Sequence, residues 1–318
     1  MKYTKLFIVL TAVFVSFTSC SSGDDGDEPV TNTPTNPAEQ VRVPLTVDVS
    51  ERTMSDASAA REGMTRTDIT TKATLSSFRM SRHIDIEPYS EVFEFKKGDG
   101  KWAAANESSM YWPDKYYPFC FYAYDAYVND IFYWNSGNPY ISVTVDENAF
   151  KQKDILVAKS IEFTDAKKPE ETVRLTFDHI CAAVGFTIKI TDKLQAKLGT
   201  SSLYVTNIKL QAIAKGGEYH YYDSRWKEIN PEQAYYTLTY TNSMEVTTTQ
   251  TEMKDLQGNP FYLFMIPQTC TASLEVKYKI GESGQEKTTT IGGININWQA
   301  GYRYFIDINL GTANIQVQ

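Results

Sequence analysis

The sequence predicts an all-β protein with two tandem β-sandwich domains, preceded by an export signal and a flexible tether. Apolar and polar residues alternate with a period of two along much of the chain, as in half-buried strands. Turn signals recur every few residues, and no helical pattern is longer than Asp192 to Leu198. Packed sheets bury such strands, so β-sandwiches are expected.

Residues 1–19 are typical of an export signal, with Lys2 and Lys5 before an apolar stretch from Leu6 to Phe17. This stretch is shorter than the ~20 apolar residues that a membrane span needs. The sequence "FTSC" then resembles the lipobox of bacterial lipoproteins, so we expect Cys20 to be lipidated; an ordinary signal peptide with an incidental cysteine is the alternative. The acids that follow resemble the surface-export signal of Bacteroidota-type lipoproteins, which predicts a surface-exposed protein of the outer membrane.

Residues 20–40 form an acidic and polar tether, because so few apolar residues cannot offset the entropy of ordering. The whole chain has a net charge of −8, and removal of the two lysines of the signal changes it from −8 to −10. No basic patch is evident, so nucleic acid is an unfavourable partner.

The tether leads into an alternating strand, "VRVPLTVDVS". Pro44 has no backbone N–H to donate to a ladder, which predicts an edge strand and therefore the most removable strand of the fold. Its apolar positions are Val41, Val43, Leu45, Val47 and Val49.

A polar stretch, residues 51–72, follows this strand and contains Arg61 and Arg66. A loop of this length in a compact domain is usually functional or disordered. Exposed loops of small polar residues are also where proteases cut.

The first domain is predicted to span residues 41–168, with its boundary between Phe163 and Glu171. "EVFEFKKGDGKWAA" predicts a hairpin that turns at Gly98, Asp99 and Gly100. An aromatic-rich stretch between Tyr111 and Trp134 could fill a core or form a platform for sugar rings. Core packing is the favoured interpretation for three of its residues: Phe119, Phe121 and Tyr122.

The second domain is predicted to span residues 169–318 and to be built from strands such as "LYVTNIKLQAIA" and "GYRYFIDINL". The turn "IGESGQEK" joins two of these strands. In "YHYYDSRW" polar residues surround the aromatic ones, so core packing and sugar binding are evenly balanced. Tyr221 and Trp226 are the candidate glycan contacts there.

No set of residues indicates catalysis or a cofactor. The three histidines, His83, His179 and His220, lie far apart without a metal-ligand spacing, and no nucleophile-elbow, zincin or P-loop motif occurs. We expect His179, at the opening of a strand, to be packed or hydrogen-bonded. We therefore predict no enzymatic activity, no metal and no cofactor.

Three cysteines remain after the lipidated one: Cys120, Cys181 and Cys270. This odd number permits at most one internal disulfide, and the wide spacings do not resemble a disulfide framework. Buried free thiols are the simpler interpretation, but the sequence does not decide between them.

Several segments together resemble the fimbrillin family, the type V pilins of Bacteroidales. "YWPDKYYPFCFYAY" is similar to the Tyr-Trp-Pro and Phe-Tyr-Ala-Tyr signature of that family. "DILVAKS" and "VRLTFDHICAAVGFTIKI" resemble its Asp-x-Leu-x-Ala segment and its Leu-x-Phe-x-His strand. "FMIPQTC" and "INWQAGYRYFIDINL" match its Ile-Pro-Gln and Trp-x-Ala-Gly-x-x-Tyr pieces. Their order holds from about Ala73 to Leu310.

This resemblance implies transthyretin-like sandwiches, lipoprotein export and assembly into adhesive fimbriae with other fimbrial subunits. In the family, a trypsin-like protease cuts after an arginine beyond the first strand, and a donor strand from the next subunit fills the groove. Arg66 is our first choice for the cut and Arg61 the second. The C-terminal "GTANIQVQ" has only Ile315 and Val317 as alternating apolar residues, which favours a tip or accessory subunit over a shaft subunit. An anchor that keeps its first strand is a third role.

Two other functions are compatible with the sequence. A monomeric surface glycan-binding lipoprotein would need its aromatic clusters exposed, and its ligand on a host or bacterial surface is unknown. A surface hydrolase would need positioned catalytic groups, for which the sequence gives no specific sign.

Overall fold

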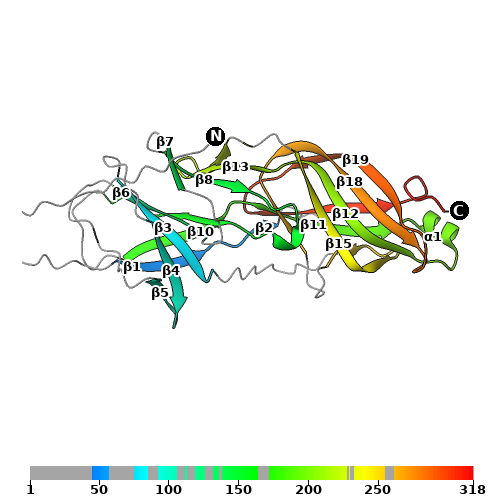
Figure 1. Cartoon of the computed structure of the whole chain (residues 1–318), viewed down its shortest axis with the longest axis horizontal. Coiled ribbons are helices and arrows are strands. Elements are labelled where there is room, and N and C mark those ends of the chain that lie inside the picture. The colour runs from blue at the N-terminus through cyan, green and yellow to red at the C-terminus, as the bar shows by residue number, and fades with distance from the viewer. Residues whose placement is uncertain are drawn as a thin grey trace, which may run out of the picture. The chain divides into compact units, whose positions relative to one another are not determined.

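A computed structural model of the chain describes residues 45–56, 75–84, 92–105, 112, 119–125, 132–135, 138–163, 172–227, 229, 233–254 and 261–317. These residues are mostly in β-strands (Figure 1), which confirms the all-β class. The predicted signal, Cys20 and the tether lie outside the described residues. So do five of the positions singled out above: Val41, Val43, Pro44, Arg61 and Arg66.

One sheet of seven strands is built mainly from the first half of the chain. The pattern of β6 explains its place in the middle, because all seven of its residues are buried. Phe119 and Phe121 pack into one cluster and Tyr122 into another, on the opposite face, which confirms the prediction that all three are core residues. In sheet order the strands are β1 (Thr46–Glu51), β10 (Thr172–His179), β9 (Leu156–Lys159), β6 (Phe119–Asp125), β3 (Ser77–Ile84), β4 (Val92–Gly98) and β5 (Lys101–Ala104).

The predicted hairpin at Asp99 and Gly100 is confirmed as the connection between β4 and β5. Both turn residues have positive φ, 46° and 79°, as a two-residue hairpin turn of this type requires. An Asp-Gly pair adopts this conformation at little cost, so the local sequence defines the turn.

A four-stranded sheet covers the second face of β6. Ile141 and Val143 from one of its strands pack with Tyr122 and Tyr124 of β6. The order of its strands is β14 (Arg225–Lys227), β13 (Gly216–His220), β8 (Asn138–Thr144) and β7 (Phe132–Asn135).

Two further sheets enclose a third core, drawn mainly from the second half of the chain. The first has the order β16 (Thr251–Glu252), β11 (Ala182–Ile190), β20 (Tyr302–Leu310) and β2 (Ser55–Asp56), with β17 (Leu263–Met265) also paired to β11. The second has the order β15 (Gln233–Val246), β12 (Leu203–Ala214), β18 (Thr269–Ile280) and β19 (Lys287–Asn297). The predicted "IGESGQEK" turn joins β18 to β19.

The short helical pattern in the sequence is confirmed as α1 (Asp192–Leu198). Thr191 caps it, because its hydroxyl oxygen accepts a hydrogen bond from the Leu194 amide at 3.3 Å. Gly199 ends the helix with a φ of 63°, a conformation that glycine adopts most easily. A single 3-10 turn, η1 (Ala149–Lys151), is the other helical element of the described chain.

The predicted domain division after residue 168 stays a prediction, and strand pairing crosses it. β10 follows that division but pairs with β1 and β9. The hairpin of β13 and β14 also follows it, yet β13 pairs with β8. His179 closes β10 instead of opening a strand as expected, because the chain passes at Ile180 and Cys181 into β11 of a different sheet.

Candidate functional site at the first strand

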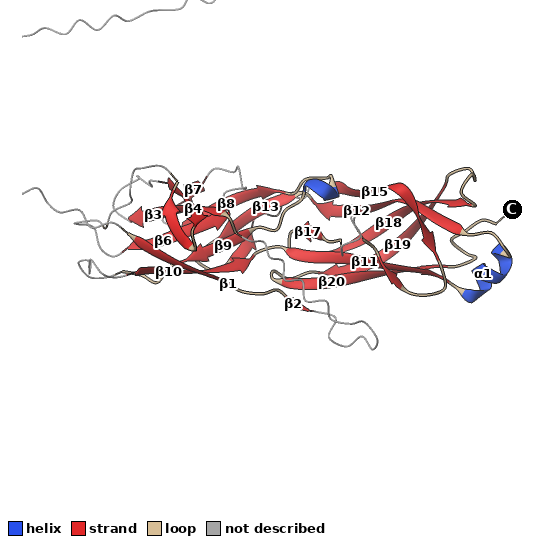
Figure 2. Ribbon diagram, turned by 90° about the horizontal axis from the view of Figure 1, so that it is seen from below, coloured by secondary structure: helices blue, strands red, loops and turns tan. Residues whose placement is uncertain are grey.

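Residues 45–56, which we call the first segment, lie at the edge of two sheets. β1 ends the order of the seven-stranded sheet, and β2 ends the order of the five-stranded sheet. Figure 2 shows β1 beside β10 and β2 beside β20. Each of the two strands therefore pairs on one side only, and neither lies between two other strands of the described chain.

β1 runs parallel to β10, with its register from Thr46 opposite Thr172 to Glu51 opposite Phe177. Among the strands that the structure describes, β10 meets β9 only at Asp178 and His179. The rest of β10 thus depends on β1 for its strand pairing. Loss of β1 would leave the ladder groups of β10 exposed along an open edge.

One face of the first segment packs on the aromatic core of the seven-stranded sheet. Leu45, Val47 and Val49 are half-buried against this core, as their alternation predicted, and Met54 is buried. Half-burial of a Val or Leu side chain contributes about 1 kcal/mol, so these three residues together contribute roughly 3 kcal/mol.

The row of inward side chains ends in a charged cluster. Glu51 follows Val49 by two residues and so lies on the same face of β1. Its carboxylate Oε1 is 3.5 Å from Nε2 of His179, and the opposite ring nitrogen, Nδ1, contacts Asp154. The His179 and Asp154 side chains are only 2% and 4% exposed, against 27% for Glu51. A buried imidazole therefore lies between two carboxylates, one of which belongs to the first segment.

The buried groups of this cluster bind protons more tightly than they would in water. Burial alone would lower the pKa of His179, but the hydrogen bond and charge of Asp154 and the charge of Glu51 raise it above its usual value. Burial raises the pKa of Asp154, which its contact with His179 opposes. Burial also raises the pKa of Glu51, and the charge of His179 opposes that shift.

Arg52 continues the pairing just beyond β1. Its amide donates to the Phe177 carbonyl at 2.9 Å, and its guanidinium lies 3.0 Å from the Asp178 carboxylate. Both side chains of this ion pair are largely exposed, at 70% and 45%. Such a pair contributes little to stability, so the first segment is attached chiefly by its ladder, its apolar row and Glu51.

The candidate glycan contacts lie on the hairpin of β13 and β14, which packs onto β6. Tyr221 is 2% exposed, and its hydroxyl donates to the Ala123 carbonyl at 2.9 Å. Trp226 is half-buried, and its indole N–H donates to the Ile180 carbonyl at 2.6 Å. A role in glycan binding stays a prediction for both, and Tyr221 has little surface to offer a sugar ring.

None of the three cysteines in the described residues forms a disulfide: Cys120 and Cys181 are buried, and Cys270 is half-buried. Within the described ranges, no three His, Cys, Asp or Glu side chains are placed to hold a metal ion. No helix among these same residues is long and apolar enough to span a bilayer.

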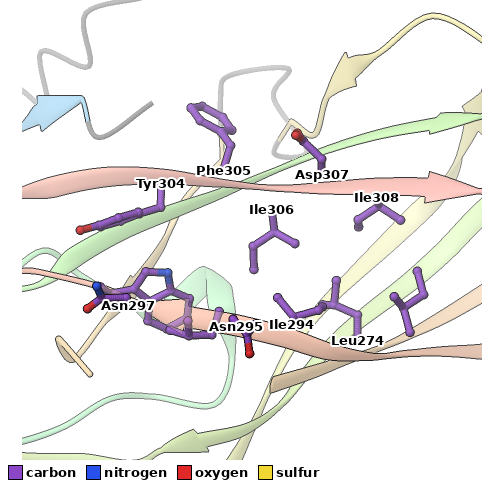
Figure 3. Close-up of a pocket in the computed structure, with 12 residues that line it drawn as sticks. Leu274, Ile294, Asn295, Asn297, Tyr304, Phe305, Ile306, Asp307 and Ile308 are labelled. Carbon is purple, nitrogen blue, oxygen red and sulfur yellow. The ribbon is translucent and has the colours of Figure 1, made fainter. Parts of the chain in front are cut away.

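A cavity of about 410 Å³ opens between β19 and β20. Figure 3 shows Ile306 and Ile308 of β20 pointing toward Ile294 and Leu274, whereas Asp307 points away. The described lining is thus apolar at its centre, and no pair of titratable groups converges there. This cavity can accept apolar groups but has no arrangement for acid–base or nucleophilic chemistry.

Stacked sheets, edge strands and an apolar cavity define a structural or binding protein. A family model described as fimbrillin-like matches residues 46–318, and the chain belongs to this fimbrillin-like family. This match confirms the resemblance to the fimbrillins, and a fimbrillin-like family agrees with the prediction of a non-enzymatic protein. It implies a place at the cell surface and other fimbrial subunits as partners.

Solved structures of Bacteroides proteins resemble the chain at low identity. A candidate cell adhesion protein from Bacteroides uniformis is 16% identical, with 87% of this chain and 96% of the other covered and a TM-score of 0.45. A similar candidate from Bacteroides ovatus is 14% identical, covers 87% and 96%, and has a TM-score of 0.49. A fimbrial protein from Bacteroides ovatus is 10% identical, covers 85% and 50%, and has a TM-score of 0.36. No curated protein matches the chain.

Proposed function

We propose that this protein is a fimbrial subunit that reaches the surface as a lipoprotein and assembles after proteolysis removes its first strand. Lipidation at Cys20 and a cut by a trypsin-like protease after Arg66, or after Arg61, belong to this proposal. A strand from another subunit would then occupy the vacated edge, which is strand addition.

The observation that carries the proposal is the edge position of the first segment in both of its sheets. The segment can leave without separating any other pair of described strands. Its departure would expose the apolar core beneath Val47 and Val49 and the pairing groups of β10. An exposed ladder with an apolar floor favours an incoming strand that offers backbone groups and alternating apolar residues.

The C-terminal residues support a tip or accessory role within this proposal. Ile315 is 1% exposed in the core of the second half of the chain, and Val317 packs against the same core. The Gln316 amide also donates to the Tyr278 hydroxyl at 3.2 Å. Ile315 and Val317 are thus already engaged within their own subunit, which leaves them unavailable as donor residues.

The test is mass spectrometry and gel analysis of surface material from cells that carry the wild type or the double variant Arg61→Ala/Arg66→Ala. We expect wild-type material to start within residues 57–74 and to include multimers that resist denaturing gel buffer. The double variant should keep its N-terminal region and lose these multimers. Arg225→Ala is the matched control, because Arg225 is an exposed arginine on β14.

Multimers whose subunits still begin upstream of Val41 would refute removal of the first strand. Lipid on Cys20 in the assembled form would refute it equally. Cys20 and the first strand both lie on the N-terminal side of the proposed cleavage site, so the cut would remove them together.

A further inference from the structure

His179 presents an unsatisfied hydrogen-bonding atom toward the first segment. Its Nε2 atom is buried and has no hydrogen-bond partner in the described chain. The Glu51 carboxylate lies 3.5 Å from this atom. The other ring nitrogen is occupied by Asp154. With Nδ1 satisfied, Nε2 is free to recognise a group on the strand that lies beside β10.

The position of Glu51 makes this recognition part of a row. One face of the first segment carries Leu45, Val47, Val49 and Glu51. The three apolar side chains pack against the aromatic core, and Glu51 follows them along the strand. The row thus reads three apolar residues at alternating positions, with a carboxylate at the end nearest His179.

We propose that His179 selects the strand that replaces the first segment, and that this strand must carry a carboxylate at the place of Glu51. The inference rests on the proposed strand exchange and identifies the chemistry of its partner: an extended segment with alternating apolar residues and an acidic residue at the His179 end of the groove. In a strand parallel to β10, as β1 is, the acidic residue follows the apolar residues in sequence. In an antiparallel strand it precedes them.

The physical reason is the cost of covering an ionic group without a partner. When the first segment leaves, water can reach Nε2, and an incoming strand covers it again. A covered donor without an acceptor costs more than an ordinary hydrogen bond contributes, and a charged donor costs the most. An aliphatic residue at the Glu51 place is therefore expected to weaken binding roughly ten- to hundredfold.

Other charged groups near His179 set the pH range of this preference. Asp154 contacts His179 from the chain before β9, and Asp178 precedes it on β10. The backbone of Arg52, next to Glu51, also raises the pKa of His179. Asp125 on β6 acts on Glu51. Because the pKa of His179 is raised, the preference should extend above the pH at which an ordinary histidine loses its proton and disappear as the pH rises through the raised pKa.

The test uses the full chain, cut by trypsin within residues 57–74, and fluorescent peptides that correspond to residues 41–56. The wild-type peptide is compared with Glu51→Leu and Glu51→Gln. Asp48→Asn is the matched control, because it removes the same charge from the exposed face of β1. Fluorescence anisotropy gives the dissociation rate of each peptide at pH 7, and again at pH 10.

We expect Glu51→Leu to dissociate roughly ten- to hundredfold faster than the wild type at pH 7, Glu51→Gln to be intermediate, and Asp48→Asn to behave as the wild type. The differences should shrink at pH 10. Equal dissociation of all four peptides would overturn the carboxylate requirement but leave strand exchange intact. Failure of every peptide to bind protein that has lost its first segment would instead overturn the proposed function.

A second measurement uses the uncut chain. Glu51→Leu should increase the hydrogen-exchange rates of the Val47 and Val49 amides relative to Asp48→Asn. Equal exchange in the two variants would show that His179 does not hold Glu51, and would overturn the inference independently of any cut.

Discussion

The burial of Tyr221 predicts a large loss of stability when this side chain is changed. Its hydroxyl donates to the Ala123 carbonyl inside the core, and its ring packs against Tyr122 with centroids 5.2 Å apart. Tyr221→Phe removes the buried hydrogen bond and should cost about 1 kcal/mol. Tyr221→Ala also leaves a cavity and should cost roughly 3–5 kcal/mol. That cost is a large part of the 5–15 kcal/mol typical of a folded domain.

The assay is urea unfolding followed by tryptophan fluorescence, with Tyr222→Phe as the control. Tyr222 is the next residue and is 76% exposed, so its substitution should change the free energy of unfolding by less than about 0.5 kcal/mol. A stable Tyr221→Ala protein that had lost binding to an oligosaccharide would refute the core assignment and favour the glycan-binding alternative. Equal effects of the two Tyr→Phe changes would also contradict it.

Three further predictions test other parts of the fold. Gly216→Ala should destabilise the protein by roughly 1–3 kcal/mol, because the new Cβ would lie 2.5 Å from the Val143 carbonyl oxygen; Gly98→Ala, where the Cβ meets nothing within 4 Å, should leave the urea midpoint nearly unchanged. The folded state holds the His179 proton more tightly than the unfolded state does, so stability should fall as the pH rises above the ordinary His value and through the raised pKa; a His179→Gln chain whose midpoint falls as steeply as the wild type would contradict this. Maleimide should label Cys270 of the native protein before Cys181, because Cys181 is fully buried and burial raises the pKa of its thiol; peptide mapping that found Cys181 labelled first would count against the burial.

Residue patterns predicted the strands better than their partners. Leu175 and Phe177 alternate in the same way as Val184 and Phe186, but the first pair lies in β10 and the second in β11 of another sheet. A period of two indicates which side chains share a face, and it carries no information about the neighbouring strand. The change of sheet at Ile180 could therefore be found only in the structure.

The site was predicted in part, for the same reason. Alternation and Pro44 identified the first strand and its edge position, which β1 confirms. The contact between Glu51 and His179 joins residues far apart in the chain. His179 is the histidine of the Leu-x-Phe-x-His motif, but that motif does not indicate its partner. Tyr221 was equally hard to place, because Tyr222 beside it is 76% exposed whereas the ring of Tyr221 packs onto β6.

The hairpin of β13 and β14 has a mechanical consequence. The chain runs from β12 into this hairpin and then into β15, which is in the same sheet as β12. The hairpin itself belongs to the sheet of β8, so the chain crosses from one sheet to the other and back. Tension that draws β12 and β15 away from β8 would act on the hairpin between them and load the ladder between β8 and β13 in shear. If the protein is the fimbrial subunit proposed above, these repeated crossings would spread a load over several parallel connections, whereas a single linker would extend.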